Sequence, residues 1–213
     1  MKYVGELLWR SVIPRSPVFT TGELADAAEI QLSNASRDLS TLAKRGLIIR
    51  IRRGLWADTR HPDFSPYAVV PFLFGKEDEG YVSLLSALSL HGMIEQIPRT
   101  IQVVSKKQRA SLKTPVGAYE FHRLKPNLFG GAEPYGQLGT FDIARPAKAL
   151  FDILYLSTRR NRRFEYLPEV ELAKNFSEKE MQSWINKVDH APLRTAIENR
   201  WRDLKLRLKS QLL

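Results

Sequence analysis

Residues 20–57 read TTGELADAAEIQLSNASRDLSTLAKRGLIIRIRRGLWA, and this stretch carries the strongest structural signals in the chain. Thr20 and Glu23 have the spacing of a capping box, in which each residue satisfies a backbone N–H group at the start of a helix. The box predicts a helix over residues 21–28, with its apolar side turned towards a core.

A second helix is predicted over residues 34–45, after the short connector 29–32. Ser33 is of the residue type that caps helix starts, and Gly46 stands where a C-terminal glycine belongs. The expected buried face has helical spacing and consists of Ala35, Leu39, Leu42 and Ala43. Two short helices joined by a tight connector are therefore expected.

A β-hairpin is predicted directly after the second helix. Side chains alternate along residues 47–53 as they do in a strand, Arg53-Gly54 is suited to a tight turn, and residues 55–57 return as a second strand. Apolar residues at helical spacing predict one more helix upstream, over residues 2–12.

The predicted order is helix, helix, short turn, helix and β-hairpin, which is the order of a winged helix-turn-helix. Residues 1–60 are therefore predicted to form such a domain. In this fold the last helix enters the major groove of DNA, with its first residues nearest the bases.

The start of the 34–45 helix has side chains suited to reading base edges. Small polar side chains allow close approach, asparagine pairs with adenine through two hydrogen bonds, and arginine pairs with guanine in the same way. The expected base-reading residues are Ser33, Asn34, Ser36 and Arg37. The expected phosphate or minor-groove contacts are Lys44, Arg45, Arg50, Arg52 and Arg53.

A second interpretation of the same residues needs no DNA, because small helix-hairpin units also mediate protein contacts. Ser33 is equally suited to be a plain helix cap, and Arg37 to lie on a solvated face. DNA contact is favoured because the stretch from Lys44 to Ala57 holds five basic residues and no acidic residue.

The whole chain is basic, since its 213 residues carry a net charge of +10. The net charge is +4 over residues 1–60, zero over 61–144 and +6 over 145–213. A basic chain favours polyanionic partners. The absence of cysteine excludes disulfides, thiolate metal sites and cysteine nucleophiles. With no apolar leader and no stretch long enough to span a bilayer, a cytoplasmic protein without membrane contact is expected.

Residues 61–66 contain two prolines and are predicted to link the first domain to a second over residues 66–213. Helices are expected there over residues 66–74, 81–91, 145–156, 178–188 and 191–212, and strands over 100–105, 118–124 and 136–143. The expected fold class is α+β, with an N-terminal winged helix-turn-helix followed by a mixed α/β C-terminal domain.

Several stretches resemble the AbiEi family, the antitoxins of type IV toxin–antitoxin systems. They read GLWA at residues 54–57, YVSLLSALSLHG at 81–92, EQIP at 95–98 and FDIARPAKALFD at 141–152. The resemblance covers most of the chain, and the second and last of these stretches are its more specific parts.

The resemblance implies two activities. The N-terminal domain would bind repeats in its own promoter and repress the operon, and the C-terminal domain would neutralise a nucleotidyltransferase-like toxin encoded beside it. The expected partners are therefore double-stranded operator DNA and that toxin. The alternative is a transcriptional regulator or protein-interaction module without antitoxin activity.

An enzyme active site is not expected. His91 is a catalytic candidate by type, with Glu95 four residues on, but a histidine at a helix end more often binds a carbonyl. The four histidines lack metal-ligand spacing and no phosphate-binding glycine loop is present, so neither a metal nor a cofactor is predicted. A nuclease is the enzyme alternative, but Glu120 is followed by His122 where a lysine is required, and Asp142 has no partner in sequence.

The densest group of charges follows the helix predicted over residues 145–156. It consists of Arg159, Arg160, Arg162 and Arg163. Three interpretations stay open: a solvated loop, an extension of the DNA footprint, and a contact for an acidic toxin surface or RNA.

Overall fold

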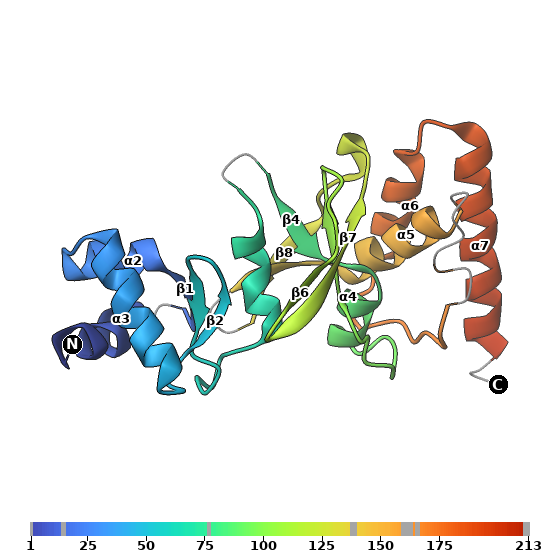
Figure 1. Ribbon diagram of the computed structural model, residues 1–213. Helices are drawn as coiled ribbons and strands as arrows, with labels where there is room; N and C mark the ends of the chain where they lie inside the picture. The colour runs from blue at the N-terminus through green and yellow to red at the C-terminus, as the bar shows by residue number, and fades with distance from the viewer. Residues whose placement is uncertain are drawn as a thin grey trace.

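The computed structural model describes residues 2–13, 16–75, 78–136, 140–158, 164 and 167–210, with side chains from residue 5 to residue 208. The chain mixes helices and strands, as the α+β prediction requires. Figure 1 shows an elongated molecule, with a small sheet and its helices at the N-terminal end, a larger sheet in the middle and further helices at the C-terminal end. No helix in the described ranges combines the length and the apolar composition needed to cross a bilayer.

The helix predicted over residues 21–28 is confirmed as α2 (Thr21–Ala28). The Thr20 hydroxyl oxygen accepts a hydrogen bond from the Glu23 backbone N–H at 3.1 Å, and Glu23 Oε2 accepts one from the Thr20 N–H at 2.6 Å. Both halves of the capping box are therefore present, and they fix where the helix begins. The helix ends at Glu29, whose φ of 53° lies in the left-handed region.

The second helix, α3 (Leu32–Lys44), begins two residues earlier than predicted, and Ser33 is not its cap. Gln31 is the residue before the helix, and its carbonyl accepts hydrogen bonds from the N–H groups of Asn34 and Ala35 at 3.0 and 3.1 Å. Since the backbone closes the first turn at Gln31, Ser33 is already inside the helix, and no side chain caps its start. Gly46, with a φ of 69°, follows the C-terminal end as predicted.

The predicted hairpin is confirmed, since β2 (Ile49–Arg52) and β3 (Leu55–Ala57) pair antiparallel on either side of a turn. Gly54 in that turn has a φ of 77°, which glycine adopts without strain. Strand β1 (Val18–Thr20) is not predicted from the sequence; it pairs with β3 and gives the sheet order β1-β3-β2. Three residues are too few to display an alternating pattern.

The predicted helix over residues 2–12 is present as α1 (Lys2–Leu7), continued by the π-helical turn η1 (Leu8–Val12). These helices, α2 and α3 enclose a small core on one face of the three-stranded sheet. Its largest buried side chains include Leu8, Phe19, Leu24, Leu39 and Trp56.

The opposite face of the same sheet belongs to the main core of the molecule. Its buried members are Val18, Ile51, Leu55 and Ala57. They share one apolar cluster with the larger sheet and with η2 (Pro66–Leu73), a 3-10 helix that stands where residues 66–74 are predicted to be helical. The small sheet is therefore buried on both faces, and the stretches predicted as two domains share a core across it.

The larger sheet has six strands in the order β6-β7-β5-β4-β9-β8 and mixes parallel with antiparallel pairs. Its strands are β4 (Gly80–Val82), β5 (Ile101–Ser105), β6 (Leu112–Thr114), β7 (Gly117–Arg123), β8 (Ala132–Tyr135) and β9 (Phe141–Ala144). β5 and β7 confirm two predicted strands, and β9 confirms the end of the third, of which residues 137–139 lie outside the described ranges. The short edge strands β6 and β8 are not predicted.

The structure corrects the prediction of a single helix over residues 81–91. Tyr81 and Val82 belong to β4, which pairs with β5 on one side and β9 on the other, and helix α4 covers only Leu84–Leu90. Backbone pairing with two neighbouring strands outweighs helical spacing in so short an apolar run.

The remaining helices are α5 (Pro146–Ser157), α6 (Glu178–Asn186) and α7 (Ala191–Ser210), with a short 3-10 turn η3 (Pro126–Leu128). All three α-helices are predicted from the sequence and confirmed. Ser177 caps α6, since its side chain accepts a hydrogen bond from the Glu180 N–H at 3.1 Å. α5 is buried along its whole length and packs against α4, α6 and α7.

Candidate nucleic-acid interface

The first half of α3 presents polar side chains to solvent. The exposed side chains are those of Ser33, Asn34, Ser36 and Arg37. None of the four forms a side-chain hydrogen bond or ion pair within the described ranges. Ala35 and Leu39 are fully buried in the small core and orient this face outward. The structure therefore brings all four predicted base-reading residues together on one accessible surface.

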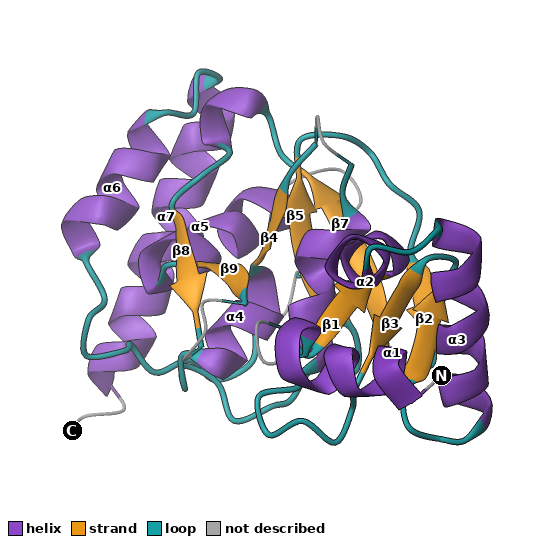
Figure 2. Cartoon of the chain, turned by 90° about the vertical axis from the view of Figure 1, so that its left-hand side faces the viewer, coloured by secondary structure: helices purple, strands orange, loops and turns teal. Residues whose placement is uncertain are grey.

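The second half of α3 offers positive charge rather than polar side chains. The Ser40 and Thr41 hydroxyls donate to the backbone carbonyls one turn back, at 2.7 and 3.0 Å, and are used within the helix. Lys44 and Arg45 are exposed at its end, and their side chains have no partner in the part of the chain that the structure describes. Figure 2 shows α3 at the outer edge of the N-terminal sheet, beside β2.

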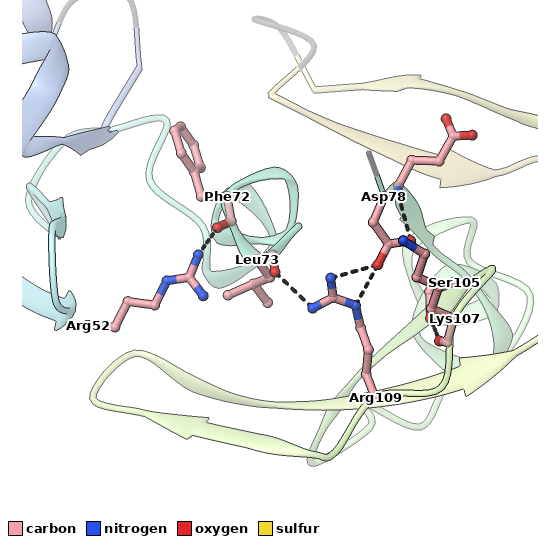
Figure 3. Close-up of polar contacts among 8 residues, drawn as sticks. Arg52, Phe72, Leu73, Asp78, Ser105, Lys107 and Arg109 are labelled. Carbon is pink, nitrogen blue, oxygen red and sulfur yellow. Dashed lines mark hydrogen bonds and ion pairs between the residues drawn. The ribbon is translucent and has the colours of Figure 1, made fainter. Parts of the chain in front are cut away.

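The three hairpin arginines differ in their surroundings. Arg53, in the turn, is exposed and has no side-chain partner among the described residues. Arg50 is exposed, and its guanidinium carbon lies 5.5 Å from the centre of the Trp56 ring. Arg52 donates a hydrogen bond to the backbone carbonyl of Phe72 at the end of η2 (Figure 3). Among the predicted phosphate contacts, Arg52 is the one whose side chain hydrogen-bonds outside the hairpin within the described ranges.

The end of η2 is held by two arginines from different parts of the molecule (Figure 3). Arg52 from β2 binds the Phe72 carbonyl, and Arg109 from the segment after β5 donates to the Leu73 carbonyl at 3.1 Å. Arg109 also forms an ion pair with Asp78 at 2.7 Å. These two hydrogen bonds to the end of η2 are not predicted from the sequence, because no spacing along the chain connects residues so far apart.

One further cation, Arg60, lies near the hairpin and is not among the predicted site residues. Arg60 is exposed, and its guanidinium donates to the Leu47 carbonyl at 2.8 Å. Asp58, the first acidic residue after the hairpin, is buried and accepts a hydrogen bond from Trp9 Nε1 at 3.3 Å. Asp58 also forms an ion pair with Arg60 at 3.5 Å, so the two charges partly neutralise each other beside the hairpin.

The positive charge of the C-terminal third is far from α3. Figure 1 shows α7 at the opposite end of the molecule. Lys205 on α7 forms an ion pair with Glu178 at 3.1 Å, so part of this charge is neutralised locally. The predicted cluster of Arg159, Arg160, Arg162 and Arg163 lies outside the described residues.

The two most specific stretches of the family resemblance meet in one buried polar cluster. Ser83, between β4 and α4, donates a hydrogen bond to Asp152 of α5 at 2.7 Å, and Asp152 forms an ion pair with Lys148. Burial lowers the pKa of the Lys148 amine and raises the pKa of the Asp152 carboxyl, while the opposite charge of each partner resists the shift. Lys148 also lies over the Trp184 ring, 4.8 Å from its centre. With both side chains of the ion pair fully buried, the cluster fixes α5 against β4 and is closed to a substrate.

The enzyme candidates are not brought together. Glu120 lies on β7 and Asp142 on β9, and β5 and β4 run between them, which separates the two strands by about 14 Å. His91 Nε2 donates a hydrogen bond to the Ala144 carbonyl at 2.8 Å, so the ring binds a backbone oxygen as expected, but one on β9 rather than at the end of its own helix. No group of three or more possible metal-ligating His, Cys, Asp or Glu residues occurs in the described ranges.

No protein-family model matches this chain, and no curated protein matches it either. The resemblance carried by residues 81–92 and 141–152 therefore stays a prediction from those motifs.

Proposed function

We propose that residues 1–60 form a winged helix-turn-helix that binds double-stranded DNA in a sequence-dependent manner. In this proposal α3 lies in the major groove and the β2–β3 hairpin is the wing. The observation that carries the proposal is the α3 surface, on which four exposed polar side chains have no partner within the described ranges. That surface lies beside a hairpin whose exposed charges are all positive.

The start of α3 supplies the groups that distinguish base pairs. Asn34 offers a donor and an acceptor to the adenine edge, and Arg37 offers two donors to guanine. Ser33 and Ser36 are small, so the helix backbone can approach the base edges closely. The positive end of the helix dipole points in the same direction and favours the approach of phosphates.

The ends of this surface supply the contacts to phosphate. Lys44 and Arg45 lie at the C-terminal end of α3, and Arg53 lies at the tip of the wing, each free of a competing partner in the described ranges. Arg50 is accessible as well. The hydrogen bond to the Phe72 carbonyl directs the Arg52 guanidinium towards η2, so we assign Arg52 to holding the wing against η2.

The wider proposal is that the protein represses its own operon and neutralises a nucleotidyltransferase-like toxin through its C-terminal part. It is supported by the family resemblance, whose two most specific stretches contribute Ser83, Lys148 and Asp152 to a single buried cluster. Growth of cells that express the neighbouring toxin gene, with and without this protein, tests that part. A regulator without antitoxin activity would leave those cells inhibited.

DNA binding is tested by fluorescence anisotropy of the full-length protein with duplexes from upstream of its own gene and with scrambled duplexes, over a salt series. We expect tight binding to the upstream DNA, weakened by Arg37→Ala. Arg123→Ala removes an exposed arginine from the central sheet and is the matched control. Weak and equal binding to both duplexes would reduce the interaction to nonspecific charge attraction and favour the interaction-protein alternative.

A further inference from the structure

Leu32 is an apolar side chain on an otherwise polar surface. It is 59% exposed, and the exposed large hydrophobic residues in the described ranges are Leu32, Ile97, Leu172 and Leu206. Only Leu32 among these lies in the N-terminal part. Single exposed leucines are common on protein surfaces, so its position has to carry the argument.

That position is the first residue of α3. Helix side chains lean towards the N-terminus, so Leu32 projects ahead of the helix start rather than along its flank. It is absent from the side chains that pack on the small core, whereas Ile30, two residues before, packs there. Ser33 is its neighbour in sequence and Ser36 lies one turn on, so the leucine borders the polar group proposed to read bases.

An apolar side chain at this point matches one feature of the major groove. The donors and acceptors of base edges are met by Ser33, Asn34, Ser36 and Arg37, but the thymine 5-methyl group is apolar and forms no hydrogen bond. Contact between a leucine and this methyl group removes apolar surface of both from water.

We infer that Leu32 is a specificity-determining residue, which reads the 5-methyl group of a thymine beside the base pairs contacted by Asn34 and Arg37. The inference rests on the proposed DNA-binding function and adds a preference that the polar residues do not supply. The recognised duplex then contains a thymine at one fixed position, and its methyl group contributes about a fourfold gain in affinity, the value for one buried methylene-sized group.

The test uses a duplex selected from a random library by the full-length protein. Each thymine in the selected duplex is replaced in turn by deoxyuridine, which removes only the methyl group, and affinities are measured by anisotropy. One replacement is expected to weaken binding about fourfold for the natural protein and to have no effect for Leu32→Ala. Leu206→Ala is the matched control, since this leucine is 61% exposed on α7 at the other end of the molecule.

The outcomes separate the inference from the proposed function. Selection of no preferred sequence overturns both. If a preferred duplex is selected and bound tightly, but every deoxyuridine replacement is neutral, the DNA-binding function stands and the role of Leu32 is wrong. A methyl effect of the same size in Leu32→Ala and in the natural protein also overturns it. The replacements in the natural protein need no variant, so a folding defect in Leu32→Ala does not decide the result.

Discussion

At the scale of the residue, the α3 surface is separable from the fold, because its polar side chains take no part in holding it. Arg37 is exposed and has no partner within the described ranges. Arg52 and Arg53 are sequence neighbours with opposite positions, one bound to the Phe72 carbonyl and the other at the open tip of the hairpin. Lys148, in contrast to Arg37, is fully buried and forms an ion pair with Asp152.

Arg37→Ala is expected to weaken binding to the preferred duplex by about 1–3 kcal/mol and to relax the preference at one base pair. Its free energy of unfolding should stay within about 0.5 kcal/mol of that of the natural protein, because no contact is lost. Anisotropy against duplexes varied at each position, together with urea unfolding, measures both. A uniform loss over all duplexes would place Arg37 on phosphate instead.

Arg53→Ala and Arg52→Ala should differ in kind. Removing Arg53 should weaken binding to all duplexes alike and reduce the salt slope by about one for the lost phosphate contact. Removing Arg52 should lower the free energy of unfolding by about 0.5–1.5 kcal/mol through the lost hydrogen bond to Phe72. If Arg52→Ala changes the salt slope and leaves stability unaltered, Arg52 is a phosphate contact and the assignment made here is wrong.

Lys148→Met should destabilise the fold by about 3–5 kcal/mol, because Asp152 is left buried and unpaired. Burial already raises the pKa of Asp152, and losing the ammonium raises this pKa further. A carboxyl whose folded pKa is raised contributes stability below its unfolded pKa of about 4 and loses it as the pH rises through the folded pKa.

The defect of Lys148→Met should therefore be smaller at pH 5 than at pH 8, which urea unfolding at the two values measures. Lys148→Met combined with Asp152→Leu removes both charges and should recover most of the loss. Equal defects at the two pH values would contradict this account of the ion pair.

At the scale of the element, local signals decide the parts of the fold that the sequence predicts. Local signals act on the nearest backbone: the capping box at Thr20 and Glu23, and the glycines Gly46 and Gly54. The start of α2, the end of α3 and the hairpin turn are therefore all predicted correctly. The start of α3 is misread because the Gln31 backbone, not a side chain, closes its first turn.

Tertiary pairing decides the elements that the sequence misses. β1, β6 and β8 are short strands that exist only beside a partner strand, and β4 is read as helix because its residues share an apolar run with α4. The residues proposed to read bases can be predicted from the sequence, because they directly follow a predicted helix start. The Arg52–Phe72 and Arg109–Leu73 bonds join distant residues and have no counterpart in spacing.

Glu29, in the turn between α2 and α3, has a strained backbone conformation that a substitution can relieve. Glu29 has a φ of 53° and is exposed, with no side-chain partner among the described residues. Glu29→Gly should raise the free energy of unfolding by about 0.5–1 kcal/mol, since glycine adopts this backbone without the cost of a Cβ. Glu29→Ala keeps the Cβ and is the control. Equal stability of the two variants, measured by thermal unfolding, would count against strain at this turn.

At the scale of the whole molecule, the proposed DNA-binding part is built into the body rather than tethered to it. One face of its small sheet is buried in the main core, and Arg52 joins the β2–β3 hairpin to η2. Figure 1 shows η2 between this hairpin and the six-stranded sheet. The position of the hairpin is therefore fixed by the C-terminal part.

A fragment of residues 1–65 should be markedly less stable than the full chain. Cutting there exposes Val18, Ile51 and Leu55, and full burial of three such side chains is worth about 5–9 kcal/mol, which is comparable with the whole stability of a domain. Thermal unfolding and the binding of a hydrophobic dye measure the effect. A fragment that unfolds cooperatively near the midpoint of the full chain, without binding dye, would show that the shared core contributes little.

The most direct test of DNA recognition by α3 uses the absence of cysteine from the chain. Ser40→Cys on α3 and Ser183→Cys on α6 each introduce the single thiol to which an iron chelate that cleaves nearby DNA can be attached. Ser40 lies outside the four residues proposed to read bases, so its modification leaves that group intact. Bound to the selected duplex, the chelate on α3 should cut both strands at one position facing the major groove, and the chelate on α6 should not cut there. Cleavage from α6, or cleavage from α3 spread evenly along the duplex, would contradict the placement of α3 in the groove.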